Sequence, residues 1–307
     1  MTQWNFTIQH TFGASNLVEV AYLGSQGHKL ENRYDADQCV PDASLLCDPA
    51  TRPYPQYAGL LIFDNDGNSN YNALVVKYNH QFSRGLTVLA EYTYSKTIMD
   101  SWEGDGTDSQ IATCRKCDRG PATFSFPQSL YISTVYDLPF GHGLRFGSDW
   151  SKAVDLFLGG WRITGIASFV SGQSFSITAP NTTSSLFSGV KADRLCDGAD
   201  SYDRHNLRSD GGVFFNTACF AQPLPAHFGN SGRGIFVGPG GNNWDLGLEK
   251  DFALYERFRM QLRGEFFNAF NHAQFEDPGS TVGGVNFGVV TTARDPREIQ
   301  LAAKFLW

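Results

Sequence analysis

Apolar and polar residues alternate with a period of two in segment after segment of this 307-residue chain. In residues 3–12, for example, Trp4, Phe6 and Ile8 fall on one face of an extended strand, and the residues between them are polar. Because successive side chains of a strand point to opposite faces, this pattern predicts an all-β fold. The alternation predicts nine strands, near residues 3–12, 16–24, 71–82, 86–95, 130–137, 161–169, 244–249, 258–266 and 298–307.

The composition excludes two classes of protein. A formal net charge of −7 is unsuited to a nucleic-acid partner, since such binding needs a basic face. No stretch approaches the roughly 18 apolar residues of a membrane-spanning helix, and residues 1–5 show no signal peptide. Charged residues are only 18% of the chain and aromatic residues are 14%, which leaves a membrane-spanning β-barrel open.

The charged residues give a check on the faces of the predicted strands. Every charge in the middle of a predicted strand falls on the face opposite the apolar residues. The charges that fall on the apolar face lie near predicted strand ends, where a long side chain can reach an interface: Lys96, Lys250 and Arg297. This predicts antiparallel transmembrane strands with a lipid-facing apolar side and a lumen-facing charged side. The lumen-facing charged residues are predicted to be Glu19, Glu91, Arg162, Arg259, Arg263 and Glu265. Aromatic residues that gather near strand ends, as in an interfacial belt, are Trp4, Tyr94, Trp161, Trp244 and Trp307.

The predicted connections alternate in length. Short turns are expected at residues 13–15, 83–85 and 253–257. The connection at residues 139–160 is longer and is expected to contain an amphipathic helix near residues 149–157. Long polar stretches cover 25–70, 97–127, 179–242 and 271–296, unless some of them carry further short strands, as 57–64 is expected to do. Long extracellular loops at one end and short periplasmic turns at the other are typical of outer-membrane barrels. Because the first strand runs toward the short-turn side, at least one earlier strand is expected, and the nine strands would be part of a larger barrel.

Several motifs then resemble one family in order along the chain. Residues 228–234 (FGNSGRG), 238–246 (GPGGNNWDL) and 263–272 (RGEFFNAFNH) resemble the C-terminal barrel of TonB-dependent receptors, and more narrowly their Oar-like branch. Further segments that fit the spacing of this family are 68–74, 92–96, 137–141 and 288–296.

The resemblance implies an outer-membrane receptor of a Gram-negative bacterium that takes up a solute. Members have a 22-stranded barrel, an internal plug and an N-terminal segment that contacts TonB. Residues 1–307 would be the C-terminal portion of such a barrel, without the plug and N-terminal domains and not competent for transport alone. The implied partners are outer-membrane lipids, the barrel-assembly machinery and, through the missing N-terminal part, TonB and the plug. The lumen-facing charges are then expected to neutralise one another and the plug.

The end of the chain resembles the terminal signal that barrels present to their assembly machinery. The alternating residues of this signal are Ile299, Leu301, Phe305 and Trp307. Members of the family more often end in Phe, so Trp307 is a departure from the pattern.

The six cysteines fall two by two in three predicted loops, and none falls in a predicted strand. An even number confined to extracellular loops favours local disulfides. Free thiols are one alternative, and a redox or zinc site at residues 114–117 is another, although the expected βαβ context or further ligands are not evident. The residues predicted to form disulfides are Cys39, Cys47, Cys114, Cys117, Cys196 and Cys219.

No motif in the sequence indicates catalysis, a cofactor or a metal. The seven histidines are scattered without ligand spacing, and residues 64–70 resemble a calcium loop but place Gly67 at the wrong position for an EF-hand. We therefore expect no catalytic, cofactor-binding or metal-binding residues, and no enzyme. The competing hypothesis is a soluble or secreted all-β module that binds carbohydrate, whose apolar faces would be buried.

Overall fold

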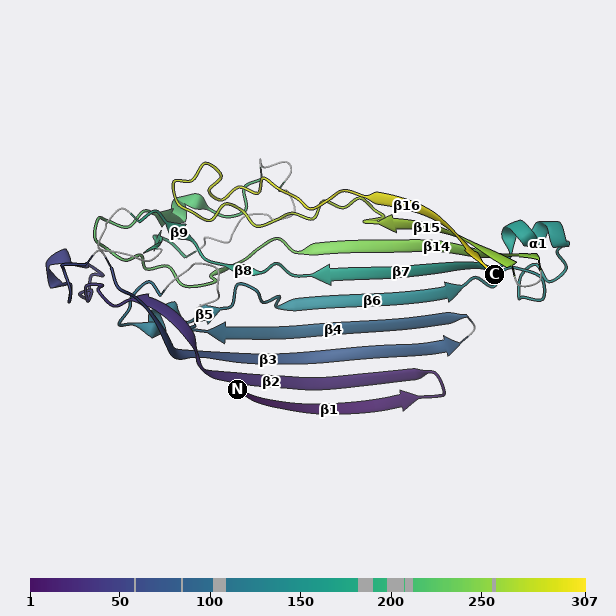
Figure 1. The fold of residues 1–307 in the computed structure, drawn as a ribbon, viewed down its shortest axis with the longest axis horizontal. Helices are drawn as coiled ribbons and strands as arrows, with labels where there is room; N and C mark the ends of the chain where they lie inside the picture. The colour runs from purple at the N-terminus through teal and green to yellow at the C-terminus, as the bar shows by residue number, and fades with distance from the viewer. Residues whose placement is uncertain are drawn as a thin grey trace.

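One antiparallel sheet dominates the computed structural model, which describes residues 1–57, 59–83, 85–101, 109–181, 190–197, 207, 212–255 and 258–307 (Figure 1). Its long strands follow one another in chain order, and short β5 (Gly120–Pro121) pairs with the end of β4. The predicted all-β fold with nine long antiparallel strands is thus confirmed. The long strands are β1 (Thr2–Phe12), β2 (Asn16–Asp35), β3 (Leu61–Ser83), β4 (Leu86–Met99), β6 (Gln128–Asp137), β7 (Trp161–Val170), β14 (Gly241–Tyr255), β15 (Phe258–Phe267) and β16 (Glu298–Leu306).

The register of the sheet keeps the apolar residues of neighbouring strands on one face. Phe6 lies opposite Tyr22, Tyr22 opposite Leu74, and Leu74 opposite Tyr94. A slip by one residue would turn a whole strand over, so the hydrophobic pattern specifies this register. The alternation in the sequence therefore becomes one continuous apolar face across the sheet.

Tight connections lie at one end of the sheet, on the right in Figure 1. Gly13 and Gly85 have φ of 63° and 82° in the β1–β2 and β3–β4 turns, a conformation that glycine adopts without strain. The β6–β7 connection carries α1 (Lys152–Leu158), which begins where the Ser151 hydroxyl accepts a hydrogen bond from the Val154 amide. Of the predicted short turns, Arg84 and residues 256–257 lie outside the described residues.

The hairpin of β2 and β3 is much longer than predicted. Residues 25–35 and 61–70 were expected to belong to a long loop, yet they pair with each other as extensions of the two strands. The strand expected at 57–64 is confirmed in part, because residues 61–64 are strand, but they begin β3 and do not form a separate element. The Asp- and Asn-rich composition of this segment suggests a turn, but pairing with the facing strand overrides this local preference.

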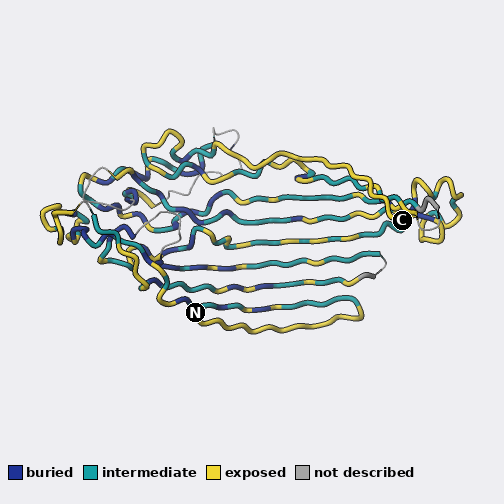
Figure 2. Tube along the Cα trace, in the orientation of Figure 1, coloured by how far each residue is buried: buried dark blue, intermediate teal, exposed yellow. Residues whose placement is uncertain are grey.

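The four long connections gather at the other end of the sheet into a body that we call the cap (the described residues within 36–60, 100–127, 171–240 and 268–297). Figure 2 shows most of the buried chain in the cap, whereas the strands are largely intermediate or exposed. The short elements of the cap are η1 (Pro49–Thr51), η2 (Arg115–Asp118), β8 (Ser174–Phe175), β9 (Thr178–Ala179), β10 (Val190–Lys191), β11 (Asp193–Arg194), η4 (Thr217–Cys219), β12 (Phe220–Ala221) and β13 (Phe236–Val237).

The cap has a hydrophobic core of its own. Phe215 stacks on Phe236 with ring centroids 4.9 Å apart, and Phe236 stacks on Phe175 at 5.5 Å. These rings come from β8, β13 and the chain before η4, and all three are buried. The prediction that residues 179–242 form a long polar stretch missed this core. The alternative prediction, that some long stretches carry further short strands, is correct.

Candidate functional site

The apolar face of the sheet is open to the surroundings. Phe6 is 65% exposed and Leu301 is 79% exposed, although both are large and apolar. A water-soluble protein rarely shows a contiguous apolar surface of this extent, whereas lipid chains would cover it. Other exposed apolar residues on this face are Trp4, Ile8, Val20, Tyr22, Leu74, Tyr78, Tyr94, Ile163, Leu248, Leu262, Ile299 and Phe305.

Ion pairs cross the strands on the opposite, polar face. Lys77 Nζ lies 3.2 Å from Glu91 and 4.0 Å from Glu19, which joins β2, β3 and β4. The register places these three residues side by side. Two of the predicted charged residues thus share a single lysine, which the sequence also placed on the polar face.

A second group of ion pairs lies on the same face across β6, β7, β14 and β15. Arg162 Nε is 2.6 Å from Asp137, and Arg263 is 3.1 Å from Glu249 and 3.5 Å from Glu265. The partners Asp137 and Glu249 were not among the predicted site residues, although their polar-face positions were readable from the alternation. Arg259 follows the same alternation on β15, nearer the short-turn end.

These ion pairs remain in contact with solvent. The side chains of Lys77 and Glu91 are each 41% exposed, and that of Arg263 is 40% exposed. Exposed pairs of this kind contribute little to stability, because water screens them. The polar face therefore suits a water-filled interior better than a packed core.

One exception to the predicted faces is Lys250. The sequence placed it near a strand end with access to an interface, but β14 continues past it and the side chain is buried. Its ammonium donates a hydrogen bond to the carbonyl of Gly159 and lies 5.5 Å from the ring of Trp161. The extension of β14 beyond the predicted 244–249 explains the difference.

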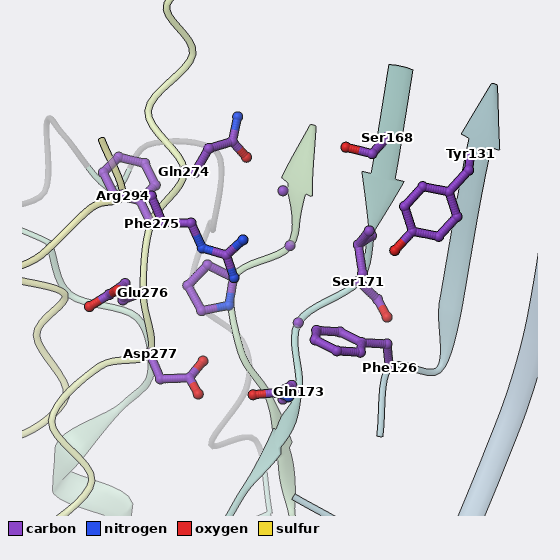
Figure 3. A pocket seen from close by; sticks show the side chains of 15 residues that line it. Phe126, Tyr131, Ser168, Ser171, Gln173, Gln274, Phe275, Glu276, Asp277 and Arg294 are labelled. Atoms are coloured by element: carbon purple, nitrogen blue, oxygen red, sulfur yellow. The ribbon is translucent and has the colours of Figure 1, made fainter. Parts of the chain in front are cut away.

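A cleft of about 500 Å³ opens where the polar face meets the cap (Figure 3). Tyr131 of β6 and Ser168 of β7 are cross-strand neighbours on the polar face and line one side of the cleft. Figure 3 shows Glu276, Asp277 and Arg294 on the other side. Further residues that line the cleft are Phe126, Val170, Ser171, Gly172, Gln173, Pro239, Gly240, Gly241, Gln274 and Phe275.

The acidic side of the cleft is held by local hydrogen bonds. The amide of Arg294 donates to the carbonyl of Gln274 at 2.8 Å, and the Thr292 hydroxyl donates to the Glu276 carboxylate at 2.9 Å. Partial desolvation raises the pKa of the Asp277 carboxyl, and the neighbouring charge of Glu276 raises it further. The cleft thus offers two carboxylates and one guanidinium beside aromatic rings.

Three disulfides constrain the cap. They join Cys39 to Cys47, Cys114 to Cys117 and Cys196 to Cys219, with Cα atoms 5.4, 5.4 and 5.1 Å apart. Each is local, and each lies in a different long connection. In the described ranges no three His, Cys, Asp or Glu side chains gather as a metal site.

The described helices include none that is long and apolar enough to cross a membrane. Residues 1–300 match a family model described as an outer membrane beta barrel domain. A search of curated proteins finds no match.

Two solved structures resemble the chain at low identity. The outer membrane transporter YddB from Escherichia coli has a TM-score of 0.51 and 10% identity, over 99% of this chain and 32% of YddB. BauA, the ferric preacinetobactin receptor from Acinetobacter baumannii, has a TM-score of 0.47 and 11% identity, over 99% of this chain and 29% of BauA. The chain spans about a third of the length of these structures, and the likeness to YddB shows the fold alone.

Proposed function

We propose that the sheet of this chain, which belongs to the family of outer membrane β-barrel domains, forms part of the wall of a larger barrel. In this proposal the larger barrel is that of a TonB-dependent receptor. The motifs described above favour the Oar-like branch of these receptors. The location would be the outer membrane of a Gram-negative bacterium, and the role would be solute uptake. The motifs and the two-faced sheet together support this proposal.

The observation that carries the proposal is the exposed apolar face on strands of membrane-spanning length. β1 has 11 residues, β6, β7 and β15 have 10 each, and β16 has 9. A tilted transmembrane strand needs about 9–11 residues. A soluble carbohydrate-binding module would bury this face, so the alternative hypothesis is disfavoured.

The edges of the sheet support a larger barrel. Within the described residues, β1 pairs only with β2, and β16 pairs only with β15. Unpaired backbone groups at a sheet edge are costly in a bilayer, where no water can satisfy them. In our proposal further strands pair with both edges, and the sheet alone does not transport.

In the closed barrel the polar face would line the lumen, with the cap on the extracellular side. Lys77 and Arg263 would each offset one of the two carboxylates that they contact along this wall. The plug and the TonB contact segment would belong to the rest of the receptor. The cleft beside Asp277 and Arg294 would be one place where an entering solute meets the wall.

The test is an immunoblot of urea-washed outer membranes of the native host, with an antibody against residues 271–296. We expect a band whose apparent mass is several times that of a 307-residue protein. A band of 307-residue size in this fraction would overturn the proposal of a larger barrel. Signal confined to the soluble fraction would overturn the membrane location and favour the binding module.

A second measurement tests the open edges. The 307 residues, expressed alone and refolded in detergent, should give no heat-modifiable and protease-resistant species, because both edges stay unpaired. A monodisperse, resistant monomer would contradict the proposal.

A further inference from the structure

The helix α1 in the β6–β7 connection turns its apolar side outward. Phe157 is 66% exposed and Leu158 is 56% exposed, and Val154 is exposed as well. Asp155 turns toward the protein instead, because its carboxylate accepts a hydrogen bond from the His142 amide at 2.6 Å. A surface helix of a soluble protein has the opposite arrangement, with apolar residues inward and charges outward.

The segment that precedes α1 adds to this apolar surface. Phe140 and Phe146 pack together with ring centroids 5.4 Å apart, and both remain exposed beside Leu144. The guanidinium of Arg145 lies 5.3 Å from the ring of Phe146. We call the exposed apolar residues of this connection the anchor patch: Phe140, Leu144, Phe146, Val154, Leu156, Phe157 and Leu158.

Two residues of the apolar sheet face hold the C-terminal end of α1. The indole of Trp161 donates a hydrogen bond to the carbonyl of Phe157 at 2.9 Å. Lys250, which is the cross-strand neighbour of Trp161, donates to the carbonyl of Gly159. Because Trp161 and Lys250 belong to the face that we assign to lipid, the anchor patch continues that face at its short-turn end.

We propose that the anchor patch is inserted into the phospholipid leaflet on the short-turn side of the membrane, at the boundary of headgroups and acyl chains. This proposal rests on the proposed function, since it needs the apolar sheet face to be in lipid. Leaving these side chains in water costs free energy in proportion to their apolar area, and an interfacial helix removes that cost. Lys152 and Arg145 have long side chains that reach anionic headgroups from the same connection.

A single cysteine label tests the location of the patch. All six cysteines of residues 1–307 are in disulfides, so within this segment one added cysteine is the only thiol for an environment-sensitive fluorophore. Any free cysteine in the rest of the receptor would first be replaced by serine. We would label the whole receptor at Phe157→Cys, Asp149→Cys or Val20→Cys. Each would be reconstituted in vesicles of phosphatidylethanolamine and phosphatidylglycerol, with and without nitroxide-labelled lipid. Asp149 is an exposed polar residue of the same connection, and Val20 lies on the apolar face of β2.

The expected result is that nitroxide lipid quenches the labels at positions 157 and 20 but not the label at 149. Aqueous iodide should quench position 157 about fivefold less than position 149, as expected for a side chain at the acyl boundary. Lipid quenching at position 20 together with full iodide access at position 157 would overturn the anchor and leave the proposed function intact. Protection of position 157 from both quenchers would also overturn it, because a protein would then cover the patch. No lipid quenching at position 20 would overturn the proposed function itself.

Discussion

The ammonium of Lys191 lies 2.5 Å from the carboxylate of Asp118, and this ion pair joins two connections of the cap that are far apart in the sequence. Lys191 also donates to the carbonyl of Cys117 at 3.0 Å. The other carboxylate oxygen of Asp118 accepts from the amide of Gln110 at 3.0 Å. Only 11% of the Lys191 side chain and 8% of the Asp118 side chain are exposed, so water does little to screen the pair.

Asp118→Ala should therefore destabilise the cap strongly. Loss of one partner leaves the Lys191 charge buried and unpaired, which costs about 3–5 kcal/mol. The measurement is the rate of limited proteolysis of the cap in isolated outer membranes, which should rise sharply.

The matched control is Asp197→Ala. Asp197 is fully exposed and pairs with Arg194 at 4.0 Å, so its loss should leave the proteolysis rate unchanged. Equal rates for wild type and Asp118→Ala would show that the buried pair does not stabilise the cap.

Adjacent residues of β1 test the assignment of the two faces. Ile8 lies on the apolar face opposite Val20, whereas the Gln9 amide donates a hydrogen bond to Glu19 on the polar face. Ile8→Arg should cost about 2–4 kcal/mol near the bilayer midplane, while Gln9→Arg gains an ion pair with Glu19 and should be tolerated. The amount of heat-modifiable receptor in urea-washed outer membranes measures both. Equal levels of the two variants would contradict the assignment.

The Cys39–Cys47 disulfide should stabilise the part of the cap that it closes. Both sulfurs are buried in a small cluster with Ile111 and Phe228. Replacing both cysteines by Ala should cost about 2–3 kcal/mol for a cross-link between residues eight apart. Urea-dependent proteolysis of the cap measures this loss. Replacing Cys114 and Cys117, only three residues apart, should cost less, and the reverse order would contradict a loop-closure origin.

The cleft carboxylate gives a prediction for pH. Because the pKa of Asp277 is raised by desolvation and by Glu276, its ionised form costs stability at neutral pH. That cost is relieved as the pH falls through the raised pKa toward the ordinary value of 3.8. Asp277→Asn should therefore melt at a higher temperature than wild type at pH 7, and the difference should shrink as the pH is lowered toward 4.

Asp42 provides a control of opposite sign. Hydrogen bonds from the Ser44 hydroxyl and from the Ser44 and Leu46 amides lower the pKa of its carboxyl. Its stabilisation is present above the ordinary value and is lost as the pH falls through the lowered pKa. Asp42→Asn should thus melt at a lower temperature than wild type at pH 7, with the difference vanishing in acid. The same sign for both variants would contradict this account of the two carboxyls.

The sheet was predictable from sequence because the apolar–polar alternation that specifies each strand lies within a short stretch of the chain. Any short window that contains Phe6 and Ile8 already shows the alternation, and the alternation sets both the strand and its faces. Strand ends were less predictable, since pairing with the partner strand extends β14 past Lys250 against the local pattern.

The cap was not predictable in the same way. Its strands β8 and β13 are two residues long, and Phe175 pairs with Phe236 across a wide gap in the sequence. No periodicity can appear in two residues, so only the abundance of phenylalanine in 171–240 hinted at a core. The cleft depends on the same long-range folding, because it brings Tyr131 of the sheet to Asp277 of the last connection.

The C-terminal strand carries the last prediction. On β16, Ile299, Leu301 and Phe305 lie on the apolar face, opposite Phe266, Gly264 and Met260 of β15. If the assembly machinery recognises this alternating pattern through its aromatic residues, Trp307→Phe should assemble as well as wild type. Trp307→Ala should instead lower the assembled receptor severalfold, and Lys304→Ala on the polar face should not. The level of heat-modifiable receptor in the outer membrane, set against total receptor in the cell, measures this. Full assembly of Trp307→Ala and of Phe305→Ala would show that the machinery does not read this end of the strand.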